Sequence, residues 1–423
     1  MASIDPVTLR RELHRHPEPA WREFETTARL VSHLESLDLD ALYVGPEAIE
    51  GDHRLAVPDD DEIERWFDRA REAGADPDVL DRLEGGYTGA VAVIERGDGP
   101  TIGLRVDIDG LPQLESDDDE HRPAAEGFRS ETGESMHACG HDAHAAIGVG
   151  TLEAVADSDF EGTLKVFFQP AEEVIGGGKS MAKSEHIEDV EYLYALHVGL
   201  DHPTGTVVAG IDDFLAVRHL EATFTGEPAH AGATPQEGRN AIQALATAIQ
   251  NCYAIPRHAD GPTRVNVGVV EAGDAANIIA EEAHLVAEVR GQTTELMAYM
   301  SERVERTLRA AAEMHDCEVE IEIGAEAPSA ESDDELREIV AEVAESVDGV
   351  DTVVHQSALG GSEDATFLMK EVQDNGGLAC YVGVGTDHPG GHHTATFDVD
   401  EPTIRHGIDT LSAAIEAIPN ADR

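Results

Sequence analysis

The chain has 423 residues, 41% hydrophobic but only 4% aromatic, so it can form two or three domains with mainly aliphatic cores. Its 86 acidic residues against 29 basic ones give a formal net charge of −57, which disfavours binding to nucleic acids and anionic membranes. The acid is spread along the chain, as on a solvated surface, and only four basic residues are lysines. This composition also predicts adaptation to multimolar salt, where screening weakens the self-repulsion.

The spacing of the cysteines and the hydropathy of the chain indicate the cellular compartment in which the protein works. The four cysteines are far apart and form no CxxC pair, which argues against a disulfide framework and favours a reducing environment. We expect Cys252, Cys317 and Cys380 to be buried as small apolar side chains. No basic-then-apolar segment opens the chain, and no apolar run approaches membrane-spanning length. The sequence therefore predicts a soluble, cytoplasmic protein.

The first half of the chain alternates helical and strand-like patterns. Helical periodicity over residues 6–37 is interrupted by HPEP, which predicts two helices around a proline-containing turn. We interpret the following acidic stretch as a linker. Strands are expected at residues 89–97, 100–110, 163–173 and 192–199, with helices at 143–156 and after GGGKSMA. This alternation predicts an α/β domain whose mixed sheet is covered by helices.

A different order begins near Phe214. The pattern there is strand, helix, strand, strand, helix and strand, over residues 217–226, 238–255, 263–273, 283–292, 295–316 and 317–326. This βαββαβ order is typical of a ferredoxin-like unit, and helix–strand alternation returns after it. We therefore expect a discontinuous catalytic domain of residues 1–215 and 328–423, with an inserted lid or dimerisation domain of residues 216–327.

The segment MHACGHDAH, residues 136–144, holds a thiol and three imidazoles. Cys139 and His141 are two residues apart, so they point to the same side if the backbone is extended. Thiolate and imidazole suit zinc, and less selectively manganese or cobalt. Alone, the segment also fits a polar loop that is rich in histidine.

Further donors lie in the same expected domain. FFQPAEE (167–173) ends in two adjacent carboxylates, ALHVG contains His197, and residues 382–401 form a glycine-rich stretch with three histidines. Singly, these fit an exposed acidic pair, a packed histidine and a polar loop. Together they could hold two close metal ions, with a non-ligating carboxylate as general base. IGGGKS (175–180) lacks the spacing of a nucleotide-binding loop and is expected to lead into a helix.

These motifs, with FTGEPAHAGATPQEGRNA (224–241), resemble the metallopeptidase and amidohydrolase family that includes carboxypeptidase G, aminoacylase and the indole-acetyl-amino-acid hydrolases. LHRHPE near the start and DGLPQLESD at 109–117 fit as well, so the resemblance covers nearly the whole chain. The phrases EGRNAIQA, RVNVGVVEAG and VRGQT favour the subgroup that acts on p-aminobenzoyl-glutamate.

The resemblance implies two divalent metal ions, zinc or manganese with cobalt as a further option. Its metal ligands correspond here to a thiolate that bridges, a carboxylate and three imidazoles: Cys139, His141, Glu173, His197 and a C-terminal histidine. In related sequences the last ligand lies four residues before a Phe, which gives His393. This chain reads HTA where relatives read HSP, so His392 remains an alternative.

The resemblance also implies roles for other residues. Glu172 corresponds to the general base, and Asp109 to a carboxylate that orients a ligand. Asp142 and His144 have no assigned role and fit a structural one equally well. His230 corresponds to a histidine that reaches across a dimer to stabilise the oxyanion; the alternative is a turn histidine.

Two further positions concern the substrate. Asn277 and Arg290 correspond to residues that hold its α-carboxylate, although Arg290 also fits a surface salt bridge. Relatives often read NVIP where this chain has NIIA, so the turn at Asn277 can differ. We therefore expect a lid that closes over a small N-acyl amino acid.

The expected function is metal-dependent hydrolysis of an N-acyl or N-aroyl amino acid such as p-aminobenzoyl-glutamate. An aminoacylase or dipeptidase with the same two-metal site is one alternative. A catalytically silent protein that binds amino-acid conjugates is another, but the chain retains every expected ligand and the base. We expect a homodimer, and the alternative is a heteromer that contains a homologous subunit.

Overall fold

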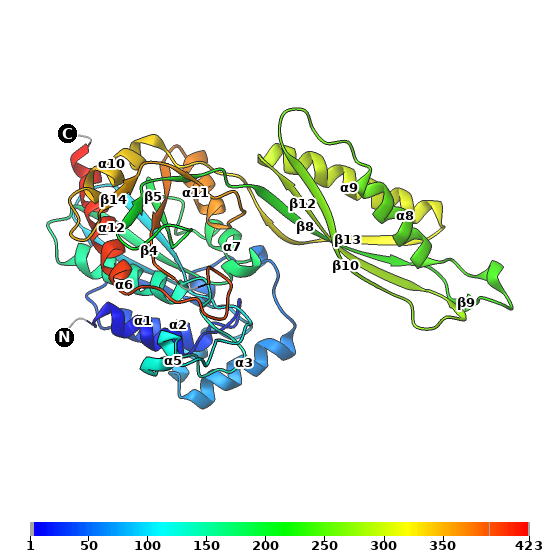
Figure 1. Ribbon diagram of the computed structural model, residues 1–423, viewed down its shortest axis with the longest axis horizontal. Coiled ribbons are helices and arrows are strands. Elements are labelled where there is room, and N and C mark those ends of the chain that lie inside the picture. The colour runs from blue at the N-terminus through cyan, green and yellow to red at the C-terminus, as the bar shows by residue number, and fades with distance from the viewer. Residues whose placement is uncertain (1–3, 389, 422–423) are drawn as a thin grey trace. The chain divides into compact units, whose positions relative to one another are not determined.

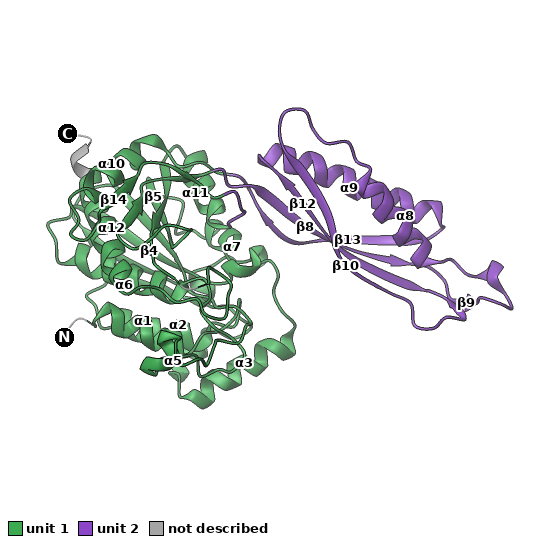
Figure 2. Ribbon diagram, in the orientation of Figure 1, with its two compact units in different colours: residues 1–212, 330–359, 364–423 green, residues 213–329, 360–363 purple. Residues whose placement is uncertain are grey.

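The computed structural model describes residues 4–388 and 390–421. Two compact units are present, each with its own sheet and hydrophobic core (Figures 1 and 2). Unit 1 comprises residues 1–212, 330–359 and 364–423, whereas unit 2 comprises residues 213–329 and 360–363. Most of unit 2 is thus one continuous insertion into unit 1.

Unit 1 is built on an eight-stranded mixed sheet. In spatial order its strands are β1 (Ala41–Val44), β2 (Ala90–Arg96), β4 (Gly162–Gln169), β3 (Thr101–Asp107), β5 (Tyr192–Val198), β16 (Leu378–Val384), β6 (Thr206–Val208) and β14 (Thr352–Val354). The run β4–β3–β5–β16 is parallel, β1 and β2 are antiparallel additions, and β6 is antiparallel to β16 but parallel to β14. A separate parallel pair is formed by β7 (Ile211–Asp212) and β15 (Ser357–Ala358).

Helices cover this sheet (Figure 1). In the described part of unit 1 they are α1 (Pro6–Arg15), α2 (Phe24–Leu34), α3 (Asp60–Ala73), α4 (Pro77–Leu80), α5 (Arg122–Glu126), α6 (His141–Ala156), α7 (Gly178–Ala182), α10 (Asp334–Ala344), α11 (Ala365–Asp374) and α12 (Pro402–Ala421). Helix α6 packs on β3, β4 and β5 and against α1 and α12, while α11 packs on β5 and β16 and against α7. The expected mixed-sheet α/β fold is confirmed.

The central helix and strands place the donors at one edge of the sheet. Every residue from 141 to 152 on α6 is buried, because apolar residues lie on all sides of this helix after its first turn and it lies inside the unit. The parallel strands β3, β4 and β5 end at the same edge, since their carboxyl ends point the same way. Asp107, the Glu172–Glu173 pair and His197 lie at these three strand ends, beside the first turn of α6.

Unit 2 is an antiparallel sheet with two helices. Its elements are β8 (Ala216–Thr225), α8 (Ala241–Tyr253), β10 (Thr263–Ala272), β12 (Glu282–Gly291), α9 (Thr294–Met314) and β13 (Glu318–Ala327). The strand order is β10-β12-β8-β13, which is the ferredoxin-like arrangement of a βαββαβ unit. Alternate residues of β12 are buried in the core shared with α8 and α9, as a one-sided sheet requires. A short pair, β9 (Ala229–His230) with β11 (Ile278–Ile279), extends this unit.

The acidic stretch after α2 is not a linker, and that expectation was wrong. Helix α3 forms there, with Ile63, Trp66, Phe67 and Ala70 buried at helical spacing. Phe67 meets Phe24 of α2 edge-on, with ring centroids 5.3 Å apart. The many acidic residues of α3 occupy its outer face and concealed this apolar stripe.

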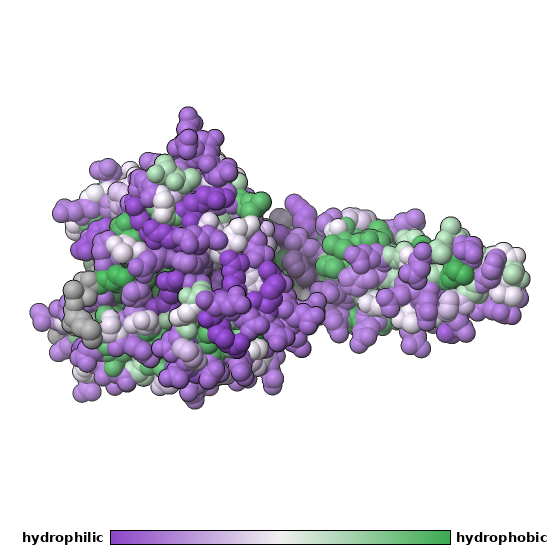
Figure 3. All heavy atoms as spheres, turned by 90° about the horizontal axis from the view of Figure 1, so that it is seen from below, coloured by the Kyte–Doolittle hydropathy of each residue, from purple (hydrophilic) through white to green (hydrophobic). Residues whose placement is uncertain are grey.

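Hydrophilic residues cover most of the surface seen in Figure 3, with smaller apolar patches between them. Most of the large apolar side chains that are exposed among the described residues belong to unit 2: Ile242, Tyr253, Val269, Val270, Ile278, Met314 and Ile323. Cys252, Cys317 and Cys380 are buried, as expected. Within the described ranges, no helix combines the length and apolar character needed to cross a bilayer.

Candidate metal centre

The side chains of Cys139 and His141 converge because a helix begins between these residues, and not because the backbone is extended. Gly140 between them is left-handed (φ 87°), and His141 is the first residue of α6. A Cβ at position 140 would lie 2.6 Å from Cγ2 of Val198, so glycine is required both for the backbone angle and for the close approach. The condition of an extended backbone is therefore not met, although the two side chains do converge.

Thiol and imidazole donors meet at the end of β5. The Cys139 Sγ atom lies 3.5 Å from Nε2 of His197. His197 Nδ1 donates to the Val198 carbonyl at 2.8 Å, which leaves Nε2 without a proton and suited to bind a metal. Donor atoms of Cys139, His141 and His197 all lie within 4.8 Å of one another, and all three residues are buried.

The two carboxylates lie on a short, strained turn after β4. Glu172–Val174 form a single 3-10 turn, flanked by Ala171 and Ile175 with φ of 58° and 56°. Left-handed backbone at residues other than glycine costs roughly 1–3 kcal/mol and is concentrated at functional sites. Glu172 Oε2 lies 3.8 Å from His141 Nε2. Donor atoms of His141, Glu172 and Glu173 likewise lie within 4.8 Å of one another.

A third group of donors includes the C-terminal loop. His393 Nε2 lies 3.5 Å from Oε2 of Glu173, and donor atoms of Cys139, Glu173 and His393 lie within 4.8 Å of one another. The neighbouring His392 directs its Nε2 toward the Val198 carbonyl, 3.2 Å away. His393, and not His392, is thus the histidine that the structure brings to the thiol and the carboxylate.

Asp109 contacts two of the expected ligands. Nδ1 of His141 lies 3.0 Å from the Asp109 carbonyl oxygen and 3.2 Å from its Oδ1, so the proton on Nδ1 is shared with these acceptors. The Glu173 amide donates to Asp109 Oδ2 at 3.0 Å. One carboxylate therefore orients an imidazole and fixes the backbone of a neighbouring carboxylate.

The donor set fits divalent metal ions. His141 Nε2 is buried and has no hydrogen-bond partner among the described residues, as expected for an atom that faces a cation. Although burial alone lowers it, the charges of Asp107 and Asp109 raise the pKa of His141 to about 10. The field that holds a proton there would equally hold a metal cation. Cys139 belongs to two of the donor groups, so its thiolate would be within reach of an ion held by either group.

The model of peptidase family M20/M25/M40 matches residues 103–417. The chain belongs to this family. It is 41% identical over 408 residues to indole-3-acetyl-aspartic acid hydrolase of Enterobacter agglomerans, covering 95% of this chain and 93% of the relative. Identity to a p-aminobenzoyl-glutamate hydrolase subunit of Escherichia coli is 39%, with the same coverage. The crystal structure of an aminobenzoyl-glutamate utilization protein from Klebsiella pneumoniae superposes with a TM-score of 0.84 at 34% identity, covering 97% and 95% of the two chains.

The chain is therefore a hydrolase of the M20/M25/M40 family, and the family resemblance is confirmed. Unlike that of His141, the pKa values of three other histidines are lowered by burial: that of His197 lies well below the usual range, that of His392 is about 4, and that of His393 is lowered. These imidazoles are neutral near pH 7, which is the form that binds metals.

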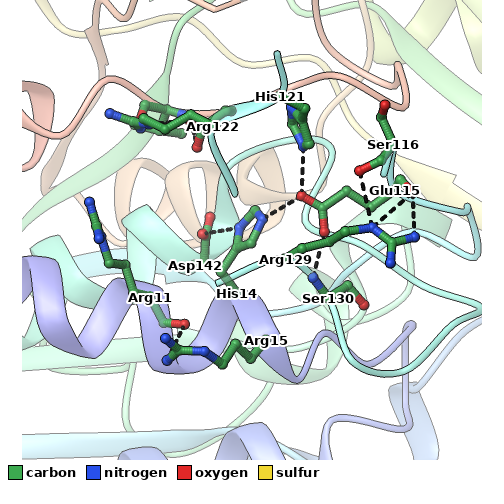
Figure 4. A network of polar contacts seen from close by, with 12 residues as sticks. Arg11, His14, Arg15, Glu115, Ser116, His121, Arg122, Arg129, Ser130 and Asp142 are labelled. Atoms are coloured by element: carbon green, nitrogen blue, oxygen red, sulfur yellow. Dashed lines mark hydrogen bonds and ion pairs between the residues drawn. The ribbon is translucent and has the colours of Figure 1, made fainter. Parts of the chain in front are cut away.

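Asp142 and His144 form polar contacts with other buried residues of unit 1. Asp142 forms an ion pair with Arg10 of α1, with an N–O distance of 2.6 Å, and accepts a hydrogen bond from His14 of α1 at 2.8 Å (Figure 4 shows the His14 contact). His144 places Nδ1 3.2 Å from Asp107, and its Nε2 accepts from the Val198 amide at 3.0 Å. Both side chains brace the first turn of α6, and donor atoms of Asp107, His141 and His144 also lie within 4.8 Å of one another.

The sequence patterns did not identify a buried arginine on β3, the strand that ends at Asp107. Arg105 on β3 is fully buried and donates to Asp107 at 2.8 Å, to Gln169 at 2.8 Å and to Asp364 at 3.0 Å. A charged residue inside the otherwise apolar strand TIGLRVD was the available signal, because buried arginines require paired carboxylates.

The expected substrate residues lie in unit 2. His230 on β9 is exposed, and its Nδ1 accepts from the amides of Gly232 and Ala233 at 3.1 Å each, so the ring proton is on Nε2. The Asn277 carbonyl accepts from the Ala231 amide, which keeps Asn277 beside His230.

Arg290 is separated from this pair. It pairs with Glu288, through two hydrogen bonds of 2.8 and 3.0 Å, near the far end of β12. Most of β12 lies between Asn277 and Arg290, about 26 Å at roughly 3.3 Å per residue. One chain therefore does not bring Asn277 and Arg290 together.

Proposed function

We propose that the protein is a metal-dependent amidohydrolase that cleaves the amide of N-acyl or N-aroyl acidic amino acids, p-aminobenzoyl-glutamate being the first candidate. The observation that carries the reaction is the position of Glu172, next to the expected ligand Glu173 and 3.8 Å from His141 Nε2. The substrate class is supported by two relatives whose names specify an aspartate and a glutamate conjugate. Both substrates combine an aromatic acyl group with a dicarboxylic amino acid.

The chemistry follows from the donors. Two divalent ions, zinc or manganese or cobalt, held by Cys139, His141, Glu173, His197 and His393, would polarise the substrate carbonyl and acidify a water molecule. Glu172 would take a proton from that water as its oxygen bonds to the carbonyl carbon. The same carboxyl would return the proton to the amide nitrogen as the C–N bond breaks. For p-aminobenzoyl-glutamate the products are p-aminobenzoate and glutamate.

We also propose that residues 216–327 act as a lid and dimerisation domain. His230 would donate from Nε2 to the developing oxyanion, and Asn277 and Arg290 would bind the substrate's carboxylates. The separation of Arg290 from His230 and Asn277 supports a site that draws on two chains. The exposed Val269 and Val270 on β10, an edge strand, support pairing with a second copy.

The partner is proposed to be a second copy of this chain. A heteromer with a homologous subunit is the alternative, since the name of the Escherichia coli relative describes one subunit of a hydrolase. The four cysteines all lie in the described ranges and form no disulfide, which supports a cytoplasmic setting.

The test measures the rate of hydrolysis by metal-loaded protein at high KCl and compares wild type with Glu172→Gln. The panel contains p-aminobenzoyl-glutamate, indole-3-acetyl-aspartate, N-acetyl amino acids and a dipeptide. We expect metal-dependent turnover of an aromatic conjugate and a loss of at least about 10³-fold in kcat for Glu172→Gln, with metal content unchanged.

Other outcomes separate the alternatives. Preference for N-acetyl amino acids or dipeptides would replace the proposed substrate with that of an aminoacylase or dipeptidase. Binding of a conjugate without turnover by metal-loaded protein would indicate a silent binding protein. Absence of bound metal on elemental analysis would contradict the mechanism itself.

A further inference from the structure

Glu23 is a fully buried carboxyl group that the proposed mechanism does not use. It precedes α2, and its side chain is 0% exposed. Oε1 accepts from the Ala171 amide at 2.8 Å, and Oε2 accepts from the Thr88 hydroxyl at 2.6 Å. Both partners are distant in sequence, and one of them directly precedes Glu172. Glu23 therefore connects the N-terminal segment with the turn that carries the catalytic carboxylate.

The turn needs such an acceptor. Ala171 has a left-handed backbone (φ 58°, ψ 36°), and no side chain caps the short helical turn that follows it. Its carbonyl closes the turn by accepting from the amides of Gly176 and Gly177, at 2.9 and 3.3 Å. The buried Ala171 amide is satisfied by Glu23, and loss of that acceptor would leave a buried donor without a partner.

Two carboxylates thus hold the backbone on either side of Glu172. Glu23 accepts from the amide of residue 171, and Asp109 accepts from the amide of residue 173. With the amides of both neighbouring residues fixed, the Glu172 side chain starts from a defined turn and reaches to 3.8 Å from His141 Nε2. Small displacements of a proton-transferring group lower the reaction rate strongly, because proton transfer requires that donor and acceptor be in contact.

We infer that Glu23 is a positioning residue for Glu172, acting through its hydrogen bond to the Ala171 amide. The inference rests on the proposed function in so far as Glu172 is the general base. Glu23 lies before residue 103, where the match to the family model begins. It would not touch substrate or metal, and its contribution would be to kcat rather than to substrate affinity.

Glu18 provides a matched control on the same segment. It is also a buried carboxylate, 3% exposed, and it also accepts two hydrogen bonds, from the amides of Glu25 at 3.0 Å and Thr26 at 2.7 Å. These bonds stabilise the start of α2, and neither reaches the turn at Ala171. Removal of Glu18 should therefore cost stability without disturbing Glu172.

The experiment compares Glu23→Ala, Glu23→Gln and Glu18→Ala as metal-loaded proteins. Unfolding temperature, kcat and KM are measured with whichever substrate of the panel the wild type hydrolyses. We expect Glu23→Ala to lower kcat by about tenfold or more with KM nearly unchanged. Glu18→Ala should lower the unfolding temperature while leaving kcat within about twofold of wild type.

Glu23→Gln tests the role of the hydrogen bond. Its amide oxygen can accept from Ala171, and its NH₂ can donate to the Thr88 hydroxyl, so kcat should stay near that of wild type. Equal losses of kcat in Glu23→Ala and Glu18→Ala would overturn the inference, and so would a Gln variant as impaired as the Ala variant. Should Glu23→Ala fail to fold, Glu23→Asp, shorter by one methylene, takes its place with the same expectations.

A readout independent of any substrate separates the two proposals. Amide hydrogen exchange is followed over residues 167–177 in the same metal-loaded proteins. Faster exchange in Glu23→Ala, with wild-type rates in Glu18→Ala, would support the positioning role even if every substrate of the panel failed. Unchanged exchange in Glu23→Ala would overturn it even if p-aminobenzoyl-glutamate were hydrolysed.

Discussion

At the scale of single residues, two adjacent histidines have different surroundings. His393 has a left-handed backbone (φ 59°), and its amide donates to the Ala138 carbonyl at 2.9 Å, which ties the C-terminal loop to the residue before Cys139. Its imidazole reaches Glu173, whereas that of His392 meets His197 edge-on, with ring centroids 5.5 Å apart. The backbone therefore places neighbouring side chains of identical chemistry in different surroundings.

Substitution of each histidine by alanine should separate these roles. We expect His393→Ala to weaken Zn²⁺ or Mn²⁺ binding by about 100-fold or more, because a ligand is lost. His392→Ala should weaken binding by less than about tenfold, since only a neighbour of His197 is removed. Chelator competition measures both, with thermal unfolding as the control for folding. A larger loss in His392→Ala would assign the last ligand to His392 instead.

At the scale of secondary-structure elements, a buried ionic network joins α1 to the first turn of α6 (Figure 4). His14 lies between two carboxylates, 2.8 Å from Asp142 and 2.9 Å from Glu115. Glu115 also accepts from His121 at 2.8 Å and from the Ser130 amide at 2.6 Å. Because Asp142 follows His141 directly, this network holds the helix end that presents an expected ligand.

The network makes stability depend on pH. Burial and the Arg10 charge lower the pKa of His14, but the hydrogen bond and charge of Asp142 and the hydrogen bond to Glu115 outweigh them and raise it to about 9. A folded-state pKa above the unfolded value means that the stabilisation is complete below about pH 6.5 and is lost as pH rises to about 9. The free energy of unfolding should fall over this range by at most roughly 3 kcal/mol through this residue.

Denaturant unfolding at pH 6, 7.5 and 9 checks this expectation. His14→Gln should be less stable than wild type at pH 6 and should approach it by pH 9. His355→Gln is the control, because His355 pairs with Glu338 at the exposed surface and such pairs contribute little. A constant difference between wild type and His14→Gln across the three pH values would show that His14 does not titrate in this range.

At the scale of the whole molecule, the net charge of −57 is the dominant electrostatic feature. Self-repulsion of this size acts against the compact state, and salt reduces it because the Debye length falls from about 10 Å at 0.1 M to about 3 Å at 1 M. We expect the unfolding temperature to rise by on the order of 10 °C between 0.1 and 2 M KCl. Sorbitol at equal osmolality is the control. Equal stabilisation by sorbitol, or none by KCl, would contradict adaptation to salt.

The proposed two-chain site can be tested by complementation. Glu172→Gln and His230→Ala chains are co-expressed with different tags, and the mixed dimers are purified. If His230 acts on the partner's site, each mixed dimer contains one complete site and should recover about half of the wild-type activity. Inactive mixed dimers would place His230 on the site of its own chain or remove it from the reaction.

Much of the fold could be predicted from the sequence, because local residue patterns determine many of its helices and strands. Apolar runs gave β2–β5, helical periodicity gave α1, α2, α8 and α9, and the order of elements in unit 2 followed from the alternation of the two. Helix α3 was missed because its acidic outer face dominates the composition, although its apolar spacing was present. The convergence of Cys139 and His141 was argued only on the condition of an extended backbone, and the structure instead has a helix start at Gly140.

The sequence by itself determined which residues could bind metal, because Cys139, His141, Glu173 and His197 stand in motifs whose donor chemistry suits divalent ions. The closeness of His393, and not of His392, to Glu173, the buried pairing of Arg105 and the connection of Glu23 to Ala171 are visible only in the tertiary structure. These relations join residues that are distant in the chain or depend on one backbone angle. Hydrogen-bond geometry and burial, which no linear pattern records, determine them.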